Sequence, residues 1–249
     1  MGKIIIIIGF VCAFLSVNAQ NKTGVIKQTQ LNYPNVKAVY DKYWASIQDS
    51  MKQRNIDPER FQIFFRVFKY EKELEIWIKN VGDTRFQLFK TFLLCATSGD
   101  LGPKKYNKDG QIPEGFYELT TLMPKDKYKY LAIKLNFPNQ ADKANEKESL
   151  TTNVFLNGTC ETTADIVIDK EDMAQLYILC VEAKNRKEYT YMDIYPCKFN
   201  KANNDMLNTY PSEKTKFWKN IKDAYLFFEE HHWLPKVHVN GKGQYIYEE

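Results

Sequence analysis

Two neighbouring segments with apolar side chains at every second position constrain the fold of this chain more than any other feature. A period of two residues is that of a β-strand, so the segments are predicted to pair as a hairpin. Phe64, Phe68 and Trp77 fall on the opposite face, and we expect both faces of this sheet to be partly covered. The alternating residues are Phe61, Ile63, Phe65 and Val67 within residues 61–70, and Leu74, Ile76 and Ile78 within residues 74–79.

The rest of the chain combines short β-segments with three amphipathic helices. Apolar residues at helical spacing predict helices over residues 36–52, 170–184 and 212–230, with Asp169 and Ser212 as N-caps. Residues 20–34 and 137–150 are polar, and we expect them to be loose. Helices set apart from a sheet indicate an α+β fold. Further strands are expected over residues 86–97, 116–123, 128–135, 154–157, 189–195 and 236–247, the last with a turn at Asn240-Gly241.

The N-terminus has the pattern of a cleaved signal peptide. Lys3 precedes an apolar run over residues 4–16, and Val17-Asn18-Ala19 supplies the small residues of a cleavage site after Ala19. The alternative is a membrane anchor, but the run is shorter than the ~20 residues that a spanning helix needs. We therefore expect residues 1–19 to be removed, leaving a periplasmic or secreted protein without a membrane span.

Charge and cysteine content exclude some functions. A net charge of +4 over 249 residues is too mild to indicate nucleic-acid binding. After signal cleavage four cysteines remain, and an oxidising compartment permits disulfides whose pairing the sequence leaves open. Cys180 falls on the apolar stripe of a helix and is expected in the core, whereas Cys95 and Cys197, at strand ends, are disulfide candidates. No spacing indicates a metal site, and we expect no cofactor.

Two segments could carry chemistry. The first is a loop rich in Gly, Pro and charge over residues 101–116, which from its residues alone is best interpreted as a hairpin connection. The second, residues 157–166, joins a short strand to a helix, a place where backbone N–H groups and reactive side chains are often presented.

Both segments resemble the L,D-transpeptidase (YkuD-type) catalytic-domain family, in its subgroup with a Gly-Pro-Lys … Asp-Gly-Gln-x-Pro-Glu-Gly loop. That loop is complete from Gly102 to Gly115, and the resemblance continues through residues 135–142 and 194–197. It implies a β-rich fold of mixed sheets with peripheral helices over residues 60–249, after a polar segment and helix at 20–59. It also implies a peptidoglycan stem peptide as ligand, held by Gly102, Pro103, Lys104, Asp109, Gly110, Gln111, Pro113, Glu114, Gly115, Gly158 and Thr162.

The sequence departs from the family's His-Gly-x-Cys-x-Ser/Thr-x-Gly-Cys motif at its two decisive positions. Asn157 stands where the family has its base and Asp165 where it has its nucleophilic cysteine, while Ala164 replaces the second glycine. An amide cannot relay a proton near neutral pH, and a carboxylate is a poor nucleophile toward an amide. We therefore predict a catalytically inactive homologue that binds stem peptide or a cell-envelope protein.

The alternative is an active L,D-transpeptidase or L,D-peptidase with a different nucleophile. Cys160 is the fallback for that role, with His231, His232 or His238 arriving from the C-terminal segment as base. The opposing interpretation makes Cys160 a structural or disulfide cysteine, and we favour it. The two differ in whether a reactive thiol is present in the folded protein.

Overall fold

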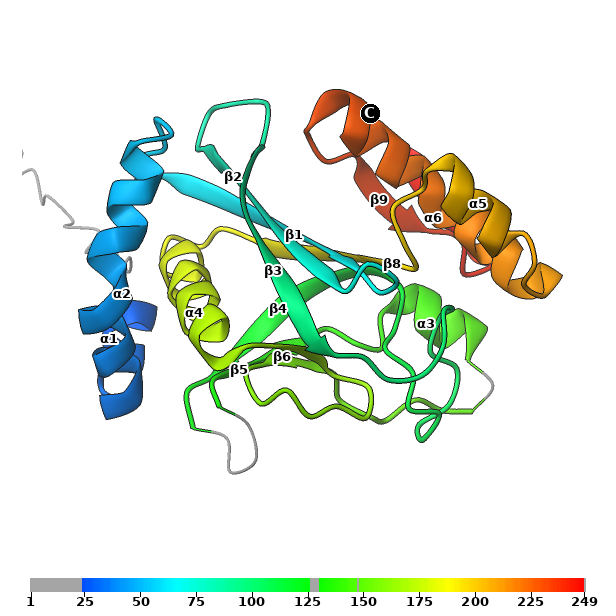
Figure 1. Ribbon diagram of the computed structural model, residues 1–249, viewed down its shortest axis with the longest axis horizontal. Helices are drawn as coiled ribbons and strands as arrows, with labels where there is room; N and C mark the ends of the chain where they lie inside the picture. Colours follow the sequence, from blue (N-terminus) through cyan, green and yellow to red (C-terminus); the bar gives the residue numbers. More distant parts are fainter. Residues whose placement is uncertain (1–23, 126–129, 147, 249) are drawn as a thin grey trace, which may run out of the picture.

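The computed structural model describes residues 24–125, 130–146 and 148–248. The predicted signal peptide and its cleavage site lie outside the described residues. The described chain forms an α+β fold, in which a closed barrel of mixed strands carries helices at both of its ends (Figure 1).

Eight strands form the barrel in the spatial order β1-β2-β3-β7-β6-β5-β4-β8. β1 pairs with β8 and β6 with β7 in parallel, and the other neighbouring pairs are antiparallel. The predicted hairpin is confirmed, with Phe61 opposite Asn80 and Phe68 opposite Glu73. The strands are β1 (Phe61–Phe68), β2 (Glu73–Asn80), β3 (Gln87–Ala96), β4 (Gly115–Met123), β5 (Ala132–Leu135), β6 (Phe155–Asn157), β7 (Ile166–Ile168) and β8 (Thr190–Tyr195).

Both faces of the hairpin are covered, as its sequence predicts. The alternating set that includes Ile63 and Phe65 lies in the main core. On the other face, Phe64 and Trp77 pack on Phe228 of helix α6 (Ser212–His231), with ring centroids 5.0 and 4.9 Å apart. Burial on both faces explains why apolar side chains occur on both faces of this hairpin.

Three helices, α1 (Val25–Leu31), α2 (Pro34–Lys52) and α4 (Lys170–Asn185), lie together at one end of the barrel (Figure 1). Asp169 caps α4 as predicted, since its side chain accepts a hydrogen bond from the backbone N–H of Glu171. The expectation that residues 20–34 are loose is wrong where they are described. α1 packs on α4, and the Tyr177 hydroxyl donates to the buried side chain of Gln30 over 2.7 Å.

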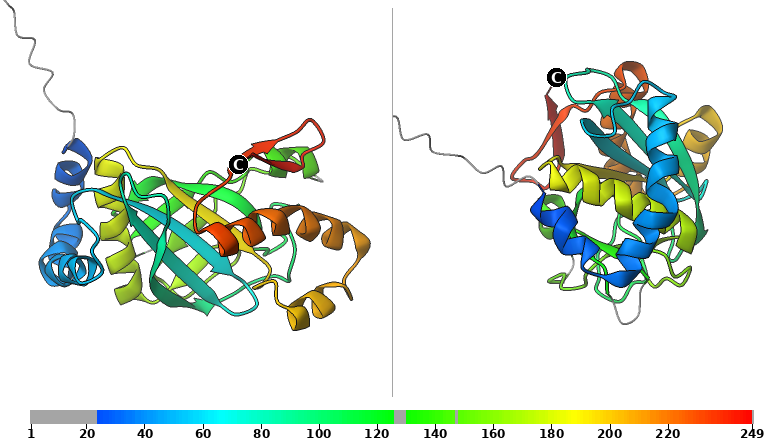
Figure 2. Two further views of the ribbon diagram at one scale, coloured as in Figure 1. Left: turned by 90° about the horizontal axis from the view of Figure 1, so that it is seen from above. Right: turned by 90° about the vertical axis from the view of Figure 1, so that its left-hand side faces the viewer.

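The opposite end carries helices α3 (Gln140–Asn145), α5 (Lys201–Leu207) and α6, and a hairpin of β9 (Lys236–Val239) and β10 (Tyr245–Glu248). Figure 2 shows the hairpin beside α3, and the Asn145 side chain donates to the Gly243 carbonyl. Residues 137–150 are thus not all loop, because a capping box at Asn139 starts α3 there. Ser212 is not a cap: Pro211 holds the N-cap position of α6, and no side chain caps it.

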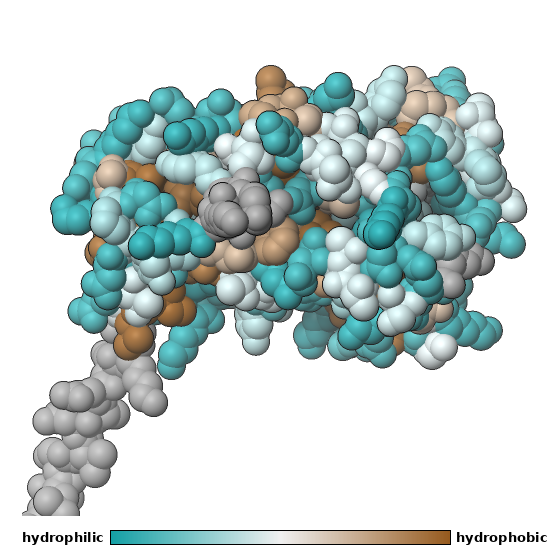
Figure 3. Space-filling model, turned by 90° about the horizontal axis from the view of Figure 1, so that it is seen from below, coloured by the Kyte–Doolittle hydropathy of each residue, from teal (hydrophilic) through white to brown (hydrophobic). Residues whose placement is uncertain are grey.

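The face of the molecule shown in Figure 3 is polar over most of its area. On the face shown in Figure 3, apolar side chains gather toward the end where the N-terminal helices lie, and Val25 and Ile26 of α1 are exposed. Within the part of the chain that the structure describes, no helix has the length and apolarity to cross a membrane.

Candidate functional site

The parallel pair β6–β7 brings together the two positions at which the sequence departs from its family motif. Asn157 ends β6, and Asp165 directly precedes β7. The Asn157 side-chain amide donates to the Asp165 carboxylate over 3.1 Å, and the other carboxylate oxygen accepts the Phe155 N–H at 3.0 Å. Both side chains are buried. The motif alignment therefore has a geometric counterpart: residues eight positions apart in sequence meet side chain to side chain.

In the loop between Asn157 and Asp165, many polar groups form hydrogen bonds with other groups of the same loop. The Asn157 side-chain oxygen accepts the N–H and the hydroxyl of Thr159, at 3.1 and 2.7 Å. The Thr162 hydroxyl donates to the Asp165 carbonyl at 2.6 Å and accepts the Ala164 N–H at 3.2 Å. Thr162 thus braces the loop, and its predicted contact with a ligand stays a prediction.

Gly158 and Ala164, the two smallest residues of this loop, occupy positions with different structural requirements. A Cβ on Gly158 would lie 2.9 Å from the Met173 Cβ, so Gly158 allows β6 to approach α4 closely. Ala164 has φ of 154°, a backbone conformation that normally requires glycine. The family motif has glycine at this second position, and the backbone there still adopts a glycine conformation.

Cys160 is not a free thiol, which contradicts its role as fallback nucleophile. Its sulfur is bonded to Cys95 at the end of β3, with the two Cα atoms 5.3 Å apart. A disulfide has no thiolate to attack a carbonyl. Cys95 is confirmed as a disulfide cysteine, but Cys197 is free and buried. Cys180 is confirmed in the core, and burial raises the pKa of the Cys180 and Cys197 thiols to about 12.

The three histidines lie in the C-terminal segment and contact that segment and β2. His231 packs between the rings of Phe227 and Trp233, and His232 stacks near Trp77. His238 lies 3.6 Å from the Glu248 carboxylate. Each of these histidine contacts lies away from the loop over residues 157–165.

The Gly102–Gly115 loop is organised around the buried carboxylate of Glu114. One oxygen accepts the Lys69 ammonium at 2.9 Å and the Gly102 N–H at 2.6 Å, and the other accepts the Trp218 indole N–H at 2.7 Å. Lys69 also donates to three backbone carbonyls, including that of Ile112. Burial lowers the pKa of Lys69 against the opposing attraction of Glu114. Glu114 therefore holds the loop to the barrel and to α6.

The remaining polar residues of the loop also bond within it. Lys104 is buried and paired with Asp109, whose carboxylate also accepts the N–H groups of Lys105 and Tyr106 at 3.0 Å. The Gln111 side chain donates to the carbonyls of Asp100 and Gly102. Lys104, Asp109, Gln111 and Glu114 thus all have a structural role in the loop, and their contact with a ligand stays a prediction. Gly110, Pro113 and Gly115 belong to the same braced turn.

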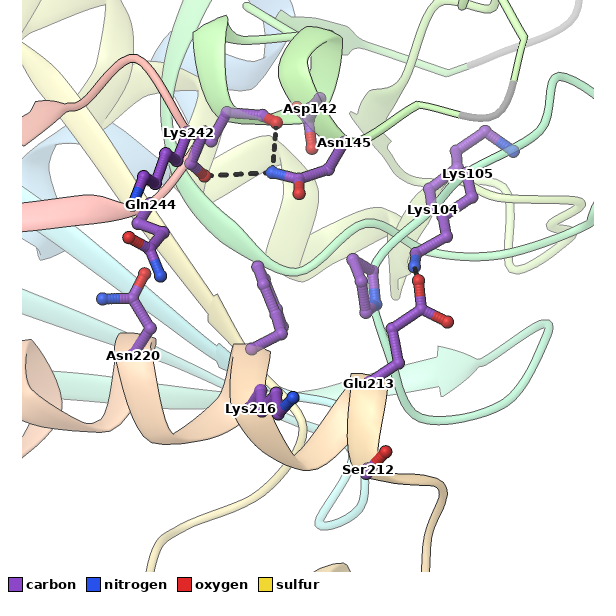
Figure 4. A pocket seen from close by; sticks show the side chains of 14 residues that line it. Lys104, Lys105, Asp142, Asn145, Ser212, Glu213, Lys216, Asn220, Lys242 and Gln244 are labelled. Carbon is purple, nitrogen blue, oxygen red and sulfur yellow. Dashed lines mark hydrogen bonds and ion pairs between the residues drawn. The ribbon is translucent and has the colours of Figure 1, made fainter.

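A pocket of about 350 Å³ opens beside this loop (Figure 4). Its walls come from Pro103 and Lys104, from α3, from the first turns of α6 and from the β9–β10 turn. Lys105 is paired with Glu213 across it. Lys216 and Lys242 are exposed and, within the described residues, form no ion pair.

Asp142 forms part of the pocket wall, but its carboxylate is already hydrogen-bonded within the protein. Its carboxylate accepts the Tyr117 hydroxyl at 3.0 Å and the Asn139 N–H at 2.9 Å. Burial raises the pKa of Asp142 to about 7. The pocket therefore has net positive charge from its two free lysines. Sequence reasoning missed it, because its lining comes from four segments far apart in the chain.

No cluster of three or more His, Cys, Asp or Glu side chains suited to a metal ion occurs in the residues that the structure covers. What the arrangement can do chemically is bind, through exposed lysines and backbone groups. At the two motif positions an amide and a carboxylate, hydrogen-bonded to each other, stand in place of the motif's imidazole and thiol.

Comparison with known proteins gives relatives of one kind. The protein named Putative L,D-transpeptidase YafK, from Escherichia coli strain K12, is 29% identical over 184 residues, which cover 72% of each chain, and the O157:H7 protein matches equally. No family model matches the chain.

Two solved structures also resemble it. The helical cell shape determining protein Pgp2 from Campylobacter jejuni has a TM-score of 0.45 and 16% identity, over 73% of this chain and 74% of that one. Bdellovibrio bacteriovorus Bd1075 has a TM-score of 0.41 and 20% identity, over 70% and 61%. Because both TM-scores are below 0.5, the assignment rests on the sequence match. That match makes the chain similar to L,D-transpeptidase-like proteins.

Proposed function

We propose that this protein acts in the cell envelope as a non-catalytic member of its family, which binds the stem peptide of peptidoglycan without cleaving it. The observation that supports this is the direct hydrogen bond between Asn157 and Asp165 at the positions of base and nucleophile. A relative whose name describes an L,D-transpeptidase supports the peptidoglycan-related part of the proposal.

The chemistry of the pair argues against acyl transfer. A thiolate activated by imidazole attacks an amide carbonyl because the imidazole takes up and returns a proton near neutral pH. The Asn157 amide cannot do so, and the Asp165 carboxylate would place negative charge next to a developing oxyanion. Losing one member of such a catalytic set already costs several orders of magnitude in rate. With both members changed and Cys160 in a disulfide, the site has no reactive group for this reaction.

In this proposal the ligand binds in the pocket beside the Gly102–Gly115 loop. We call it the lysine pocket, because Lys216 and Lys242 line it. Lys104 and Lys105 were the natural candidates for stem carboxylates, but both are paired with acids. Lys216 and Lys242 have no such partner among the described residues and reach the same pocket. An exposed ammonium attracts a carboxylate at long range, so these two lysines suit a peptide with several carboxylates. In this proposal the protein works in the periplasm or outside the cell, after loss of residues 1–19.

The test uses the mature protein and purified peptidoglycan, with co-sedimentation and released products measured in parallel. The natural protein is expected to sediment with the polymer and to release no product. Lys216→Ala with Lys242→Ala is expected to weaken sedimentation. Lys52→Ala with Lys219→Ala removes the same charge from exposed helix positions outside the pocket and is the matched control.

A restoration variant tests the inactive site itself. Asn157→His with Asp165→Cys is expected to gain measurable cleavage or exchange of stem peptide. Product formed by the natural protein at the rate of an intact relative would refute the inactive assignment. Equal sedimentation of the two double-lysine variants would refute the lysine pocket as the binding site. It would not bear on the proposal that the site at Asn157 and Asp165 is inactive.

A further inference from the structure

The outer face of β8 carries side chains that the fold leaves open to solvent. Met192 and Ile194 point into the barrel core, so Tyr191 and Asp193 point outward, and Tyr189, just before the strand, lies on the same side. The rings of Tyr189 and Tyr191 stack 5.2 Å apart at an angle of 10°, yet the residues are 62% and 41% exposed. A flat pair of aromatic faces thus lies on the surface of the barrel.

The segment that follows α6 forms the opposite wall of a groove over this face. One hollow of about 280 Å³ is bounded by Tyr189, Tyr191 and Trp233, and a second of about 540 Å³ is bounded by Tyr191, Asp193 and residues 234–239. Tyr191 and Leu234 line both hollows, which makes them one continuous groove. None of its lining residues belongs to the lysine pocket.

Asp193 lines the second hollow of the groove with one oxygen that is not bonded within the protein. Asp193 is 8% exposed, and one of its oxygens accepts the Tyr195 hydroxyl at 2.9 Å. Within the described residues the other oxygen has no hydrogen-bond partner, and it is not among the atoms sealed from solvent. A ligand hydroxyl in the groove can donate to this oxygen in place of water. Exposed side-chain amides of Asn136 and Gln140 line the same hollow.

The charges along the groove nearly cancel. Lys79 faces Glu188 in the first hollow, and Lys236 accompanies Glu118 and Asp193 in the second. The groove therefore has little net charge with which to attract a strongly charged ligand, whereas the lysine pocket has a net positive charge. A purely apolar ligand would leave the Asp193 oxygen unsatisfied. The lining favours an uncharged ligand that has both flat apolar faces and hydroxyl groups.

We propose that this groove binds a neutral oligosaccharide chain. The C–H face of a pyranose ring packs on the Tyr189–Tyr191 rings, and a hydroxyl of the next ring donates to Asp193. Trp233, from the opposite wall, covers the chain at its outer end. The site shares no lining residue with the lysine pocket, which it borders at α3 and β10, and it does not depend on the function proposed for that pocket.

Titration of the full mature chain with cellotetraose and with chitotetraose tests the proposal, by calorimetry and by tryptophan fluorescence. At least one of these uncharged tetrasaccharides is expected to bind. Tyr191→Ala is expected to weaken binding about tenfold, because it removes the stacked face shared by both hollows. Tyr106→Ala is the matched control, since Tyr106 is similarly exposed at 48% and lies outside the groove.

The outcomes separate clearly. Binding that Tyr191→Ala weakens and Tyr106→Ala leaves unchanged supports the site. Binding of chitotetraose alone assigns N-acetylated sugars, and binding of both assigns the pyranose ring itself. No binding of either sugar at millimolar concentration, or equal binding by the two variants, would overturn the proposal. Melting curves of both variants, expected to match the natural protein, exclude unfolding as the cause.

Discussion

Replacing Glu114 by Gln tests whether the family's signature loop is structural in this protein. Glu114 is fully buried, and its two oxygens accept the Lys69 ammonium, the Gly102 N–H and the Trp218 indole. Glutamine keeps the shape but has one acceptor oxygen. Its amide group must then face a donor, and the Lys69 ammonium, whose side chain is 4% exposed, loses its counter-charge.

The expected cost is large because the pair is buried. Breaking a buried ion pair by neutralising one partner costs about 3–5 kcal/mol of unfolding free energy, since the other charge stays uncompensated. For a chain of this size each kcal/mol lowers the melting temperature by roughly 2–4 °C, so the expected fall is roughly 6–20 °C. Backbone carbonyls around Lys69, including that of Ile112, solvate it in part and place the cost toward the lower end.

Urea unfolding followed by circular dichroism measures this cost directly. Glu213→Gln is the matched control, because Glu213 pairs with Lys105 at the surface, where ion pairs contribute about 0–1 kcal/mol. A loss below about 1 kcal/mol for Glu114→Gln, equal to that of the control, would refute the structural role of the loop.

Three further changes test other parts of the structure. Ala164→Gly is expected to raise the unfolding free energy by about 1 kcal/mol, since φ of 154° suits glycine, and urea unfolding would show it. Cys95→Ser with Cys160→Ser is expected to lower it by about 4 kcal/mol, because the disulfide closes a loop with a sequence separation of 65, and the reduced natural protein should show a similar loss. Burial raises the pKa of Asp193 from 3.8 to about 7, so the natural protein should lose stability as pH rises from 4 to 7. Asp193→Asn should remove its share of that loss, up to roughly 4 kcal/mol above pH 7, and leave the share of Asp142, whose pKa is also raised to about 7. Melting with the same pH dependence in both proteins would contradict this.

The elements that could be predicted are those whose periodicity is set by burial. The hairpin at residues 61–79 and the helix after Asp169 have apolar residues at fixed spacing, and both lie where expected. The helix at Val25–Leu31 was missed because it is largely exposed and depends on contacts with α4 through Gln30. The three-residue strand β7 is too short to give a period at all.

The candidate site could be predicted only in part for a similar reason. The motif selects Asn157 and Asp165, and the parallel pairing of β6 with β7 then brings their side chains into contact. The partner of Cys160 could not be derived, because the disulfide depends on β3 lying beside β7 in the barrel. The pocket with Lys216 and Lys242 joins segments that no local pattern connects.

The closure of the barrel also restricts how this protein can associate with others. Each of its eight strands has a neighbour on both sides in the barrel order, so an extended peptide can add only where that pairing is incomplete. Within the described residues, such flanks occur at the β9–β10 hairpin and along the first part of β3, which pairs with β7 only at Leu94 and Ala96. Along the rest of the barrel, recognition of partners must use side chains and pockets.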